Sequence, residues 1–556
     1  MTLMAEDTGV FKRLEEFVSA ELASRGHTGS SVSVVKKNEI VWAKGFGHSN
    51  AEAGTPATPD TVYRCASVTK PVVTFGLLQL MEKGKFHLDD PVNHHLDVKI
   101  RTEFEEQPTI RDLLTHNSGM PTRVPPIFLE KDEAPNLRDY IRDAARTVRP
   151  PRESWAYCNT GFAIVGHLIE LFSGLPYDEY LRRNVLGPLE MDSSDFELTP
   201  KLRGRLAQGY KRAGGPDKPL QPVEPYVLGM RPEDPAGSMF STVMDLAKFV
   251  VANMNGGAYK GKRVLGEETV EKMHRLQAGS GGSRSGMALT WFRSIHDGHA
   301  MLSHTGGLPD YTNHVAFYPE EGVGICWLSN LQDGSGWRPP APTALRIVAR
   351  ERPRVDPEAF QAVPENWRSL VGVYGDETRK SYVTVQNGFL LLDGALILDR
   401  VDRARYRVHG ARSDGYELTF EYNEDGVAKQ YDLGTAAIPR YVEEKIKVEE
   451  GADLTGTWRG EYHDSSGFHT VELAIDGPTS ARATDTEGNW VALEEFRAEA
   501  GKVSGGARFT IPEEFARWGT EKEISVRFEL AAVGGKLKGL IRSGVSALPL
   551  TLERTC

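Results

Sequence analysis

The alternation of apolar and polar positions divides this chain into a mixed first part and a strand-rich second part. Residues 9–25 have the spacing of an amphipathic helix. Residues 31–35 and 40–45 are apolar runs around a short polar turn, which predicts a hairpin, and 314–319 with 322–328 predict another. Because strands lie near both ends of the first part and helices lie between them, we expect one α+β domain whose sheet joins its two ends.

Helical spacing fills the middle of the first part. Residues 67–83 predict a helix, with Pro71 near its start, where a missing N–H costs little, and Gly84 as its stop. From 105 to 275, helix-like segments alternate with loops rich in Pro and Gly, and 343–350 predict a last helix.

The second part begins after residues 352–365, whose Pro and charge content is typical of a linker. Short alternating strands follow, predicted at 382–385, 389–392, 416–422, 471–475, 524–530 and 537–541. Leu370-Val371-Gly372-Val373-Tyr374 also resembles Leu454-Thr455-Gly456-Thr457-Trp458, which lies 84 residues further on. We therefore expect a first domain over 1–351 and two small antiparallel β-barrel domains over 366–448 and 449–556.

Composition excludes some classes of function. The net charge of −11 counts against a nucleic-acid binder, since phosphate binding needs clustered Lys and Arg. The most apolar stretch, 162–172, is interrupted by polar residues and is too short to span a membrane. The first residues carry acids and no apolar signal core, so we expect a cytoplasmic protein unless a leader has been removed. The four scattered cysteines, Cys65, Cys158, Cys326 and Cys556, are typical of free thiols in a reducing compartment.

Ser67 and Lys70 are the first candidates for chemistry. They stand three residues apart at the start of the predicted helix, so both side chains face the same side. Acyl transfer without a metal needs a nucleophile, a base and an oxyanion site. A partly buried lysine can lose its proton and accept that of a serine hydroxyl, and a helix N-terminus adds positive potential. The spacing alone is common, and a helix cap followed by a surface lysine is the alternative.

Tyr157 and Asn159 are the second pair of candidates. They lie where a loop leads into a predicted helix near Thr160, so both side chains can point into a cleft. A hydrogen-bonded tyrosine can share the role of base with Lys70, and an amide can orient a substrate carbonyl. Alternatively, Tyr157 packs in the core and Asn159 caps the helix.

His304, Gly306 and Gly307 are the third set, between two strand-like runs. Two glycines permit close approach of a substrate to a strand edge. The N–H of Gly307 can then join that of Ser67 in an oxyanion hole. An ordinary turn is the alternative.

The three sets together resemble a known family. Ser67-Val68-Thr69-Lys70, Tyr157-Cys158-Asn159 and His304-Thr305-Gly306-Gly307, in this order, resemble the motifs of the penicillin-recognising serine hydrolases, which include class C β-lactamases, low-molecular-weight penicillin-binding proteins, esterases and D-aminopeptidases. Residues 109–119, 184–189 and 235–242 look like the same family, so the resemblance covers the whole first domain.

The resemblance implies a fold and a set of roles. The fold is an α+β catalytic domain with an antiparallel sheet flanked by helices. Ser67 is the acylated nucleophile, Lys70 and Tyr157 are the proton-transfer pair, and Asn159 binds substrate. His304 stands where many β-lactamases of this family have Lys, which points away from efficient β-lactam hydrolysis and toward the peptidase and esterase branches.

The two predicted β-barrels narrow the resemblance to the bacterial D-aminopeptidases. In that group a loop of the last domain reaches the active site and restricts substrates to small ones with a free amino terminus. Residues 484–490 are the candidate loop, in which Asp485 or Glu487 can pair with a substrate ammonium; an exposed turn is the alternative. We expect an aminopeptidase that releases N-terminal D-amino acids from small peptides or amides. An esterase or β-lactamase-like hydrolase and a catalytically idle binding module are the alternatives.

No cofactor, metal or nucleic-acid partner is expected. Residues 256–262 spell GxxxxGK, but Arg263 follows in place of Ser or Thr, and no HExxH or GxSxG motif occurs. The expected partner is a small-molecule or short peptide substrate, with no membrane. The sequence leaves the oligomeric state open, and a homodimer is compatible with it.

Overall fold

The computed structural model describes most of the chain. The described residues are 5–24, 26, 28–121, 134–212, 219–223, 231–279, 284–296, 299–332, 338–349, 367–375, 380–386, 389–393, 396–409, 415–434, 437–440, 448–464, 467–484, 489–510, 523–543 and 546–555. The predicted linker at 352–365 lies outside them.

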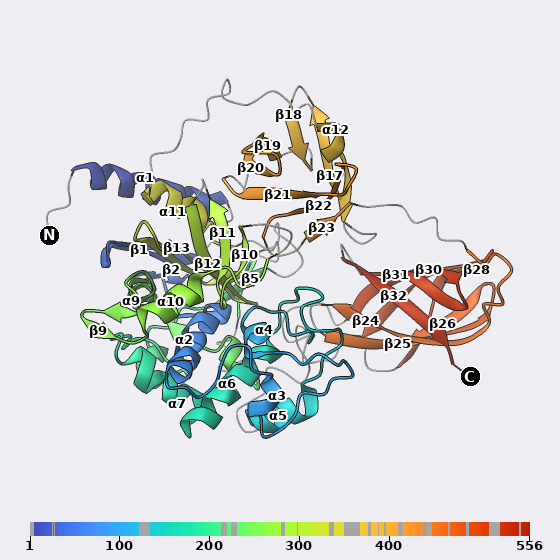
Figure 1. Cartoon of the computed structure of the whole chain (residues 1–556), viewed down its shortest axis with the longest axis horizontal. Helices are drawn as coiled ribbons and strands as arrows, with labels where there is room; N and C mark the ends of the chain where they lie inside the picture. The colour runs from blue at the N-terminus through green and yellow to red at the C-terminus, as the bar shows by residue number, and fades with distance from the viewer. Residues whose placement is uncertain are drawn as a thin grey trace.

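An eight-stranded antiparallel sheet forms the centre of the first part of the chain (Figure 1). In spatial order its strands are β10 (Gly286–Met287), β11 (Phe292–His296), β12 (His299–Leu308), β13 (Tyr311–Tyr318), β14 (Val323–Ser329), β1 (Gly29–Lys36), β2 (Glu39–Asn50) and β3 (Thr55–Pro56). Val32 of β1 lies opposite Trp327 of β14, so strands from the two ends of this part are neighbours. Both predicted hairpins and the sheet that joins the two ends are confirmed.

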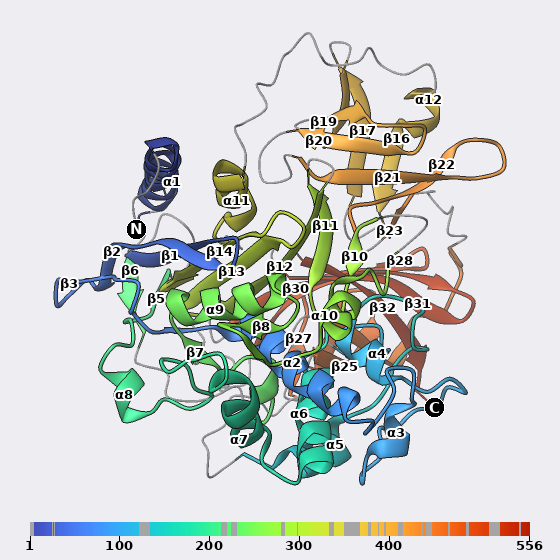
Figure 2. The same ribbon diagram turned by 60° about the vertical axis from the view of Figure 1, so that its left-hand side comes forward.

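Helices cover both faces of this sheet. α1 (Ala5–Ser24) and α11 (Ala341–Ala349) lie side by side on one face, where Leu14 and Leu345 belong to the same apolar cluster as Trp327 (Figures 1 and 2). The other face packs against α9 (Val243–Met254), with α2 (Thr69–Glu82) and α6 (Thr160–Ser173) beyond it in the largest apolar cluster of the described chain. The sheet is therefore apolar on both sides, which explains why β13 and β14 are buried along their whole length.

Short elements complete this part. They are the 3₁₀ turns η1 (Ala66–Val68) and η3 (Asp234–Ala236), the π-helical turn η2 (Arg182–Leu186), the helices α3 (Val92–His95), α4 (Ile110–Leu114), α5 (Leu137–Ala144), α7 (Tyr177–Leu181), α8 (Pro200–Arg203) and α10 (Glu267–His274), and the strands β4 (Tyr63–Arg64), β5 (Tyr210–Arg212), β6 (Leu220–Pro222), β7 (Phe240–Ser241), β8 (Ala258–Tyr259), β9 (Lys262–Arg263) and β15 (Leu331–Gln332).

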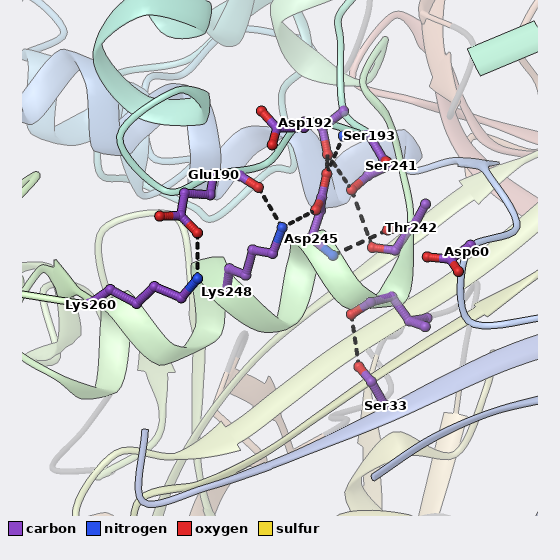
Figure 3. Close-up of polar contacts among 12 residues, drawn as sticks. Ser33, Asp60, Glu190, Asp192, Ser193, Ser241, Thr242, Asp245, Lys248 and Lys260 are labelled. Atoms are coloured by element: carbon purple, nitrogen blue, oxygen red, sulfur yellow. Dashed lines mark hydrogen bonds and ion pairs between the residues drawn. The ribbon is translucent and has the colours of Figure 1, made fainter. Parts of the chain in front are cut away.

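The start of α9 is fixed by a polar network (Figure 3). The Thr242 hydroxyl caps the helix by accepting the N–H of Asp245 at 3.2 Å. The Asp245 carboxylate accepts the Ser193 N–H at 2.7 Å and the Lys248 ammonium at 2.7 Å, and the Ser33 hydroxyl of β1 donates to the first carbonyl of α9 at 2.8 Å. The network anchors the start of α9 to β1 and to the loop at Ser193.

The second part of the chain forms two nearly closed antiparallel β-barrel sheets, as predicted. The first consists of β16 (Gly372–Gly375), β17 (Lys380–Gln386), β18 (Phe389–Leu392), β19 (Leu396–Arg400), β20 (Arg405–His409), β21 (Glu417–Tyr422), β22 (Ala428–Asp432) and β23 (Ala437–Pro439), preceded by α12 (Trp367–Leu370). The second, in spatial order, consists of β27 (Trp490–Ala492), β26 (Ser480–Thr484), β25 (Gly467–Gly477), β24 (Gly456–Asp464), β32 (Ser546–Arg554), β31 (Lys536–Ser543), β30 (Glu523–Val533), β29 (Lys502–Thr510) and β28 (Glu494–Glu499).

The sequence repeat corresponds to a structural repeat between the two barrels. The Tyr374 hydroxyl donates to the Leu370 carbonyl at 2.6 Å, and the Trp458 indole N–H donates to the Leu454 carbonyl at 3.0 Å. Both rings are buried, and each lies in the strand of its barrel that comes first along the chain. In each barrel an aromatic residue therefore closes the strand onto the residue four positions before it.

An arginine completes the same unit in both barrels. The Arg440 guanidinium lies 5.7 Å from the Tyr374 ring centroid, and that of Arg554 lies 5.4 Å from Trp458. A Cβ on Gly372 would lie 2.7 Å from Arg440, and one on Gly456 would lie 3.3 Å from Arg554. The glycine of each repeat thus leaves room for an arginine. In the first barrel this is Arg440, directly after β23, and in the second it is Arg554, the last residue of β32.

The first barrel docks on the edge of the central sheet. Arg284 donates twice to the Glu417 carboxylate, at 3.1 and 2.6 Å, and Glu417 is buried. His296 at the end of β11 forms an isolated bridge with Tyr416, just before β21. β10 and β11 thus have the barrel on one side and β12 on the other (Figure 1).

Candidate active site

Ser67 lies in a tight turn directly before α2, rather than inside the predicted helix. Residues Ala66–Val68 form the 3₁₀ turn η1, and α2 begins at Thr69. Ala66 is fully buried and has a φ of 49°, in the left-handed region that costs a residue with a Cβ on the order of 1 kcal/mol or more. Ser67 is the partly exposed residue of an otherwise buried turn. Such a turn presents one hydroxyl at the surface of a rigid scaffold.

Strand β12 packs directly against this turn. A Cβ on Gly306 would lie 2.3 Å from the Cys65 carbonyl oxygen, so only glycine fits there. On β13, the Asn313 amide donates to the Arg64 carbonyl at 2.8 Å. Gly306 therefore serves close packing of the strand on the backbone before Ser67.

Lys70 is fully buried and donates to three oxygen atoms. Its Nζ lies 3.0 Å from Ser67 Oγ, 2.8 Å from Asn159 Oδ1 and 2.7 Å from the Ala236 carbonyl oxygen. Asn159 makes no side-chain cap to α6, which excludes the capping alternative.

These partners leave the hydrogen bond between Lys70 Nζ and Ser67 Oγ as the one whose direction can reverse. An amide oxygen and a carbonyl oxygen only accept hydrogen bonds, so Asn159 and Ala236 hold two of the Nζ protons. The third position of Nζ points at the Ser67 hydroxyl. It carries a proton when Lys70 is an ammonium and a lone pair when it is an amine, so a proton can pass along this 3.0 Å bond.

The ring of Tyr157 lies against Lys70 and against a buried histidine. Lys70 Nζ is 4.8 Å from the Tyr157 ring centroid, and the His116 ring centroid is 4.3 Å from it. His116 Nδ1 accepts the Cys158 N–H at 3.1 Å, which places the imidazole proton on Nε2. Burial, together with the charge of Lys70, lowers the pKa of His116 well below its usual value, so the ring is neutral.

His304 has the opposite tautomer. Its Nδ1 is 2.7 Å from the Thr305 carbonyl oxygen, which only accepts, so Nδ1 carries the proton and Nε2 a lone pair. Among the described residues Nε2 is buried without a hydrogen-bond partner. Burial and the charge of Lys70 lower the pKa of His304 to about 3. His304 is thus a neutral acceptor.

The end of β12 is open on one side. β11 pairs with β12 only as far as Phe292 opposite Ser303, so within the described strands residues 304–308 pair with β13 alone. Gly307 is exposed in this stretch, and a Cβ on it would lie 3.0 Å from the Arg338 guanidinium. An extended substrate can lie along this free edge.

Aromatic side chains form a wall beside the histidines. The Trp155 ring lies 6.2 Å from Phe292 and 6.4 Å from Tyr157, and Phe292 lies 5.4 Å from His304. Trp155 and Phe292 are both partly exposed. The wall offers apolar area to a substrate side chain.

Several of the predicted site residues come together. Ser67, Lys70 and Asn159 share hydrogen bonds, Tyr157 and His304 contact them through ring and charge interactions, and Gly306 packs on the turn. Asp485 lies outside the described residues. Burial raises the pKa of the Cys158 thiol to about 12, which counts against a thiolate nucleophile.

Sequence reasoning missed two contributors to the site. Ala236 lies inside the stretch 235–242 that resembles the family, but its residue type gave no sign that its carbonyl would accept from Lys70, 166 residues away. His116 was visible inside the stretch 109–119 that resembles the family, but nothing local gave it a position beside Tyr157.

The fold and this geometry define a serine hydrolase of the β-lactamase/penicillin-binding-protein type. The family model described as Beta-lactamase matches residues 14–350. The protein therefore belongs to the β-lactamase family of serine hydrolases.

Similar proteins agree with this assignment. Protein flp of Staphylococcus aureus (strain N315) is 24% identical over 332 residues, which is 58% of this chain and 63% of flp. The octameric penicillin-binding protein homologue from Pyrococcus abyssi matches with a TM-score of 0.53 and 21% identity, over 97% of this chain and 99% of that one. D-amino acid amidase from Ochrobactrum anthropi SV3, in complex with D-phenylalanine, matches with a TM-score of 0.51 and 22% identity, over 61% and 98%. The chain thus spans less than two thirds of flp, whereas the P. abyssi protein shares the fold along nearly all of the chain.

Proposed function

We propose that the protein hydrolyses amide bonds through an acyl-enzyme on Ser67, with Lys70 and Tyr157 as the proton-transfer pair. Ser67 Oγ attacks the substrate carbonyl carbon while its proton moves to Lys70 Nζ. The leaving amine then takes a proton from the Lys70–Tyr157 pair, and water releases the acyl group. The observation that supports this proposal is the 3.0 Å bond from Lys70 to Ser67, with the other two Nζ protons held by fixed acceptors.

The proposed substrates are small peptides or amides with an N-terminal D-amino acid. The supporting observation is the neutral state of His304, which brings no positive charge to the position where many β-lactamases of the family have Lys. A lysine there would attract a substrate carboxylate and repel an ammonium, whereas a neutral imidazole does neither. The matched D-amino acid amidase is compatible with this substrate class.

Three earlier predictions remain proposals. Asp485, in the loop 484–490, would pair with the substrate ammonium.

The cytoplasmic location is supported by three buried free thiols, Cys65, Cys158 and Cys326. Among the described helices none is long and apolar enough to cross a membrane. A homodimer or larger assembly is supported by the octameric state of the P. abyssi homologue, and light scattering on the purified protein would measure it.

A substrate panel tests the proposed function. D-alanine p-nitroanilide, its L-enantiomer, p-nitrophenyl butyrate and a chromogenic cephalosporin are compared for wild type and Ser67→Ala. We expect turnover of the D-anilide with kcat/KM at least about 10-fold above the L-form, and loss of all turnover in Ser67→Ala. Ester or cephalosporin turnover without cleavage of either anilide would contradict the peptidase assignment and favour the esterase or β-lactamase alternative.

A further inference from the structure

A buried carboxylate lies behind the candidate site. Glu233 is 0% exposed and occupies the residue before the turn η3. Its Oε1 accepts the Tyr140 hydroxyl at 2.9 Å and the Thr160 hydroxyl at 2.9 Å. The two hydroxyls lie 3.3 Å apart. An ionised carboxylate is costly to bury. Two hydroxyl groups that donate to it therefore indicate that this buried position is built to hold a carboxylate.

Glu233 joins the two segments that hold Lys70. Thr160 is the first residue of α6 and directly follows Asn159, whose Oδ1 accepts from Lys70. Ala236 closes η3 with its N–H donating to the Glu233 carbonyl at 2.8 Å, and its own carbonyl accepts from Lys70. The Glu233 carboxylate therefore ties the start of α6 to η3, and these two elements supply both fixed acceptors of Nζ.

The charge of Glu233 reaches the same region. The pKa of the Cys158 thiol is raised chiefly by burial, with Glu233 raising it further and Lys70 lowering it, so both charges act on one buried atom. Tyr140, whose pKa is raised well above its usual value by burial and by Glu233, stays a neutral donor. Around Lys70, His116, His304 and the Cys158 thiol are neutral at pH 7, the Tyr157 ring centroid lies 4.8 Å from Nζ, and Asp234 pairs with Arg231 at 3.0 Å.

We propose that Glu233 is a positioning residue that sets the proton affinity of Lys70. It holds Asn159 and Ala236 at the spacing that Nζ needs, and its negative charge favours the ammonium form of Lys70. The pH at which Lys70 becomes a base for Ser67 therefore depends on Glu233. This inference rests on the proposed role of Lys70 as the proton acceptor.

The test measures how fast a fluorophosphonate labels Ser67 as a function of pH. The probe requires only an activated Ser67, so labelling of wild type tests the proposed function and the variants test the inference. In Glu233→Gln we expect the acidic limb of the rate profile to move down by about 1 pH unit, because the ammonium loses a favourable charge. Tyr140→Phe keeps the carboxylate and removes one of its hydroxyl donors, so its limb should stay closer to that of wild type than the limb of Glu233→Gln does.

Two controls distinguish an effect of Glu233 on Lys70 from a general disturbance of the fold. Glu417→Gln removes another buried carboxylate, at the barrel interface, and should leave the limb in place. Glu233→Ala should lose at least about 10-fold in rate, of which Glu233→Gln recovers part, because glutamine keeps the hydroxyl contacts. A Glu233→Gln profile that overlays that of wild type, or one that Tyr140→Phe shifts down equally, would overturn the inference. Absence of labelling in wild type would instead contradict the proposed function.

Discussion

The residues around Lys70 affect which group donates in the hydrogen bond between Ser67 and Lys70. Burial disfavours the ammonium form of Lys70, while the acceptors Asn159 and Ala236 are satisfied by either form. Both acceptors therefore fit Lys70 as an ammonium and as an amine, which the proposed exchange of a proton with Ser67 requires. The neutral His304 and His116 add no positive charge that would interfere with this exchange.

Substitution of His304 tests the proposed substrate preference. In His304→Lys the lone pair is replaced by a donor, so we expect kcat/KM for D-alanine p-nitroanilide to fall by about 10- to 100-fold. Acylation by a cephalosporin, whose carboxylate accepts from an ammonium, should rise relative to wild type. His304→Gln serves as the control of similar size. An unchanged ratio of anilide to cephalosporin reactivity in His304→Lys would contradict the assignment of His304 as an acceptor.

At the scale of elements, the contact between β12 and η1 determines where the hydroxyl of Ser67 lies. Gly306→Ala would push β12 away from the Cys65 carbonyl, because the new Cβ would lie 2.3 Å from it. We expect labelling of Ser67 to slow by at least about 10-fold and the protein to lose on the order of 2 kcal/mol of stability.

Gly307→Ala is the matched control for this substitution. Its Cβ would meet the end of the flexible Arg338 side chain at 3.0 Å, which can move. It should therefore leave stability nearly unchanged. Equal loss of thermal stability in Gly306→Ala and Gly307→Ala would show that the contact with Cys65 is unimportant.

The sequence predicted the elements whose pattern reflects their own packing. The hairpins formed by β1 with β2 and by β13 with β14 are apolar runs separated by short turns. They could therefore be predicted from the local spacing of apolar residues. The helix predicted from residue 67 starts at Thr69, because residues 66–68 form a 3₁₀ turn packed against β12, with Ala66 in a left-handed conformation. A tertiary contact of this kind leaves no local signal.

The same distinction holds for the candidate site. Ser67, Lys70 and Asn159 carry side chains whose types and order indicate the chemistry. The Ala236 carbonyl and the tautomers of His116 and His304 depend on backbone groups brought together by folding. These features could not be predicted from residue types alone.

At the scale of the molecule, the first barrel supports β11, which carries part of the candidate site. β11 lies between the barrel and β12 and contributes Phe292 to the aromatic wall. Arg284 binds Glu417 across this contact. The barrel thereby supports one side of the aromatic wall beside His304.

A double-mutant cycle tests this coupling. Arg284→Ala removes two hydrogen bonds to the buried Glu417 and leaves it the Arg405 guanidinium at 3.6 Å, so we expect a loss of about 2 kcal/mol in stability. KM for D-phenylalanine p-nitroanilide should rise more than kcat falls, because Phe292 loses its support. Arg284→Ala with Glu417→Gln should recover much of the stability. Additive effects of the two substitutions would show that the pair does not join the barrel to the sheet.

The buried histidines predict how stability depends on pH. The pKa values of His116 and His304 are lowered as described, and burial lowers that of His314 to about 4. Below pH 6.5 the unfolded chain therefore binds protons that the folded chain does not. Stability present above pH 6.5 is lost as the pH falls, by about 1.4 kcal/mol per pH unit for each neutral histidine.

The measurement is the thermal midpoint of wild type and His314→Gln at pH 5 and pH 7.5. Asp234 and Asp310, whose pKa values burial raises to about 7 and about 6, act in the opposite direction and are common to both proteins. The fall in midpoint between pH 7.5 and pH 5 should be smaller in His314→Gln. Equal falls in the two proteins would contradict the lowered pKa of His314.

The most direct test of the whole account is the intact mass of the protein after incubation with a fluorophosphonate. We predict one adduct on wild type, none on Ser67→Ala, and labelling slowed by about 100-fold or more in Lys70→Met, with Lys83→Met unaffected. An unlabelled wild type, or an adduct that persists in Ser67→Ala, would contradict the assignment of Ser67 as the nucleophile.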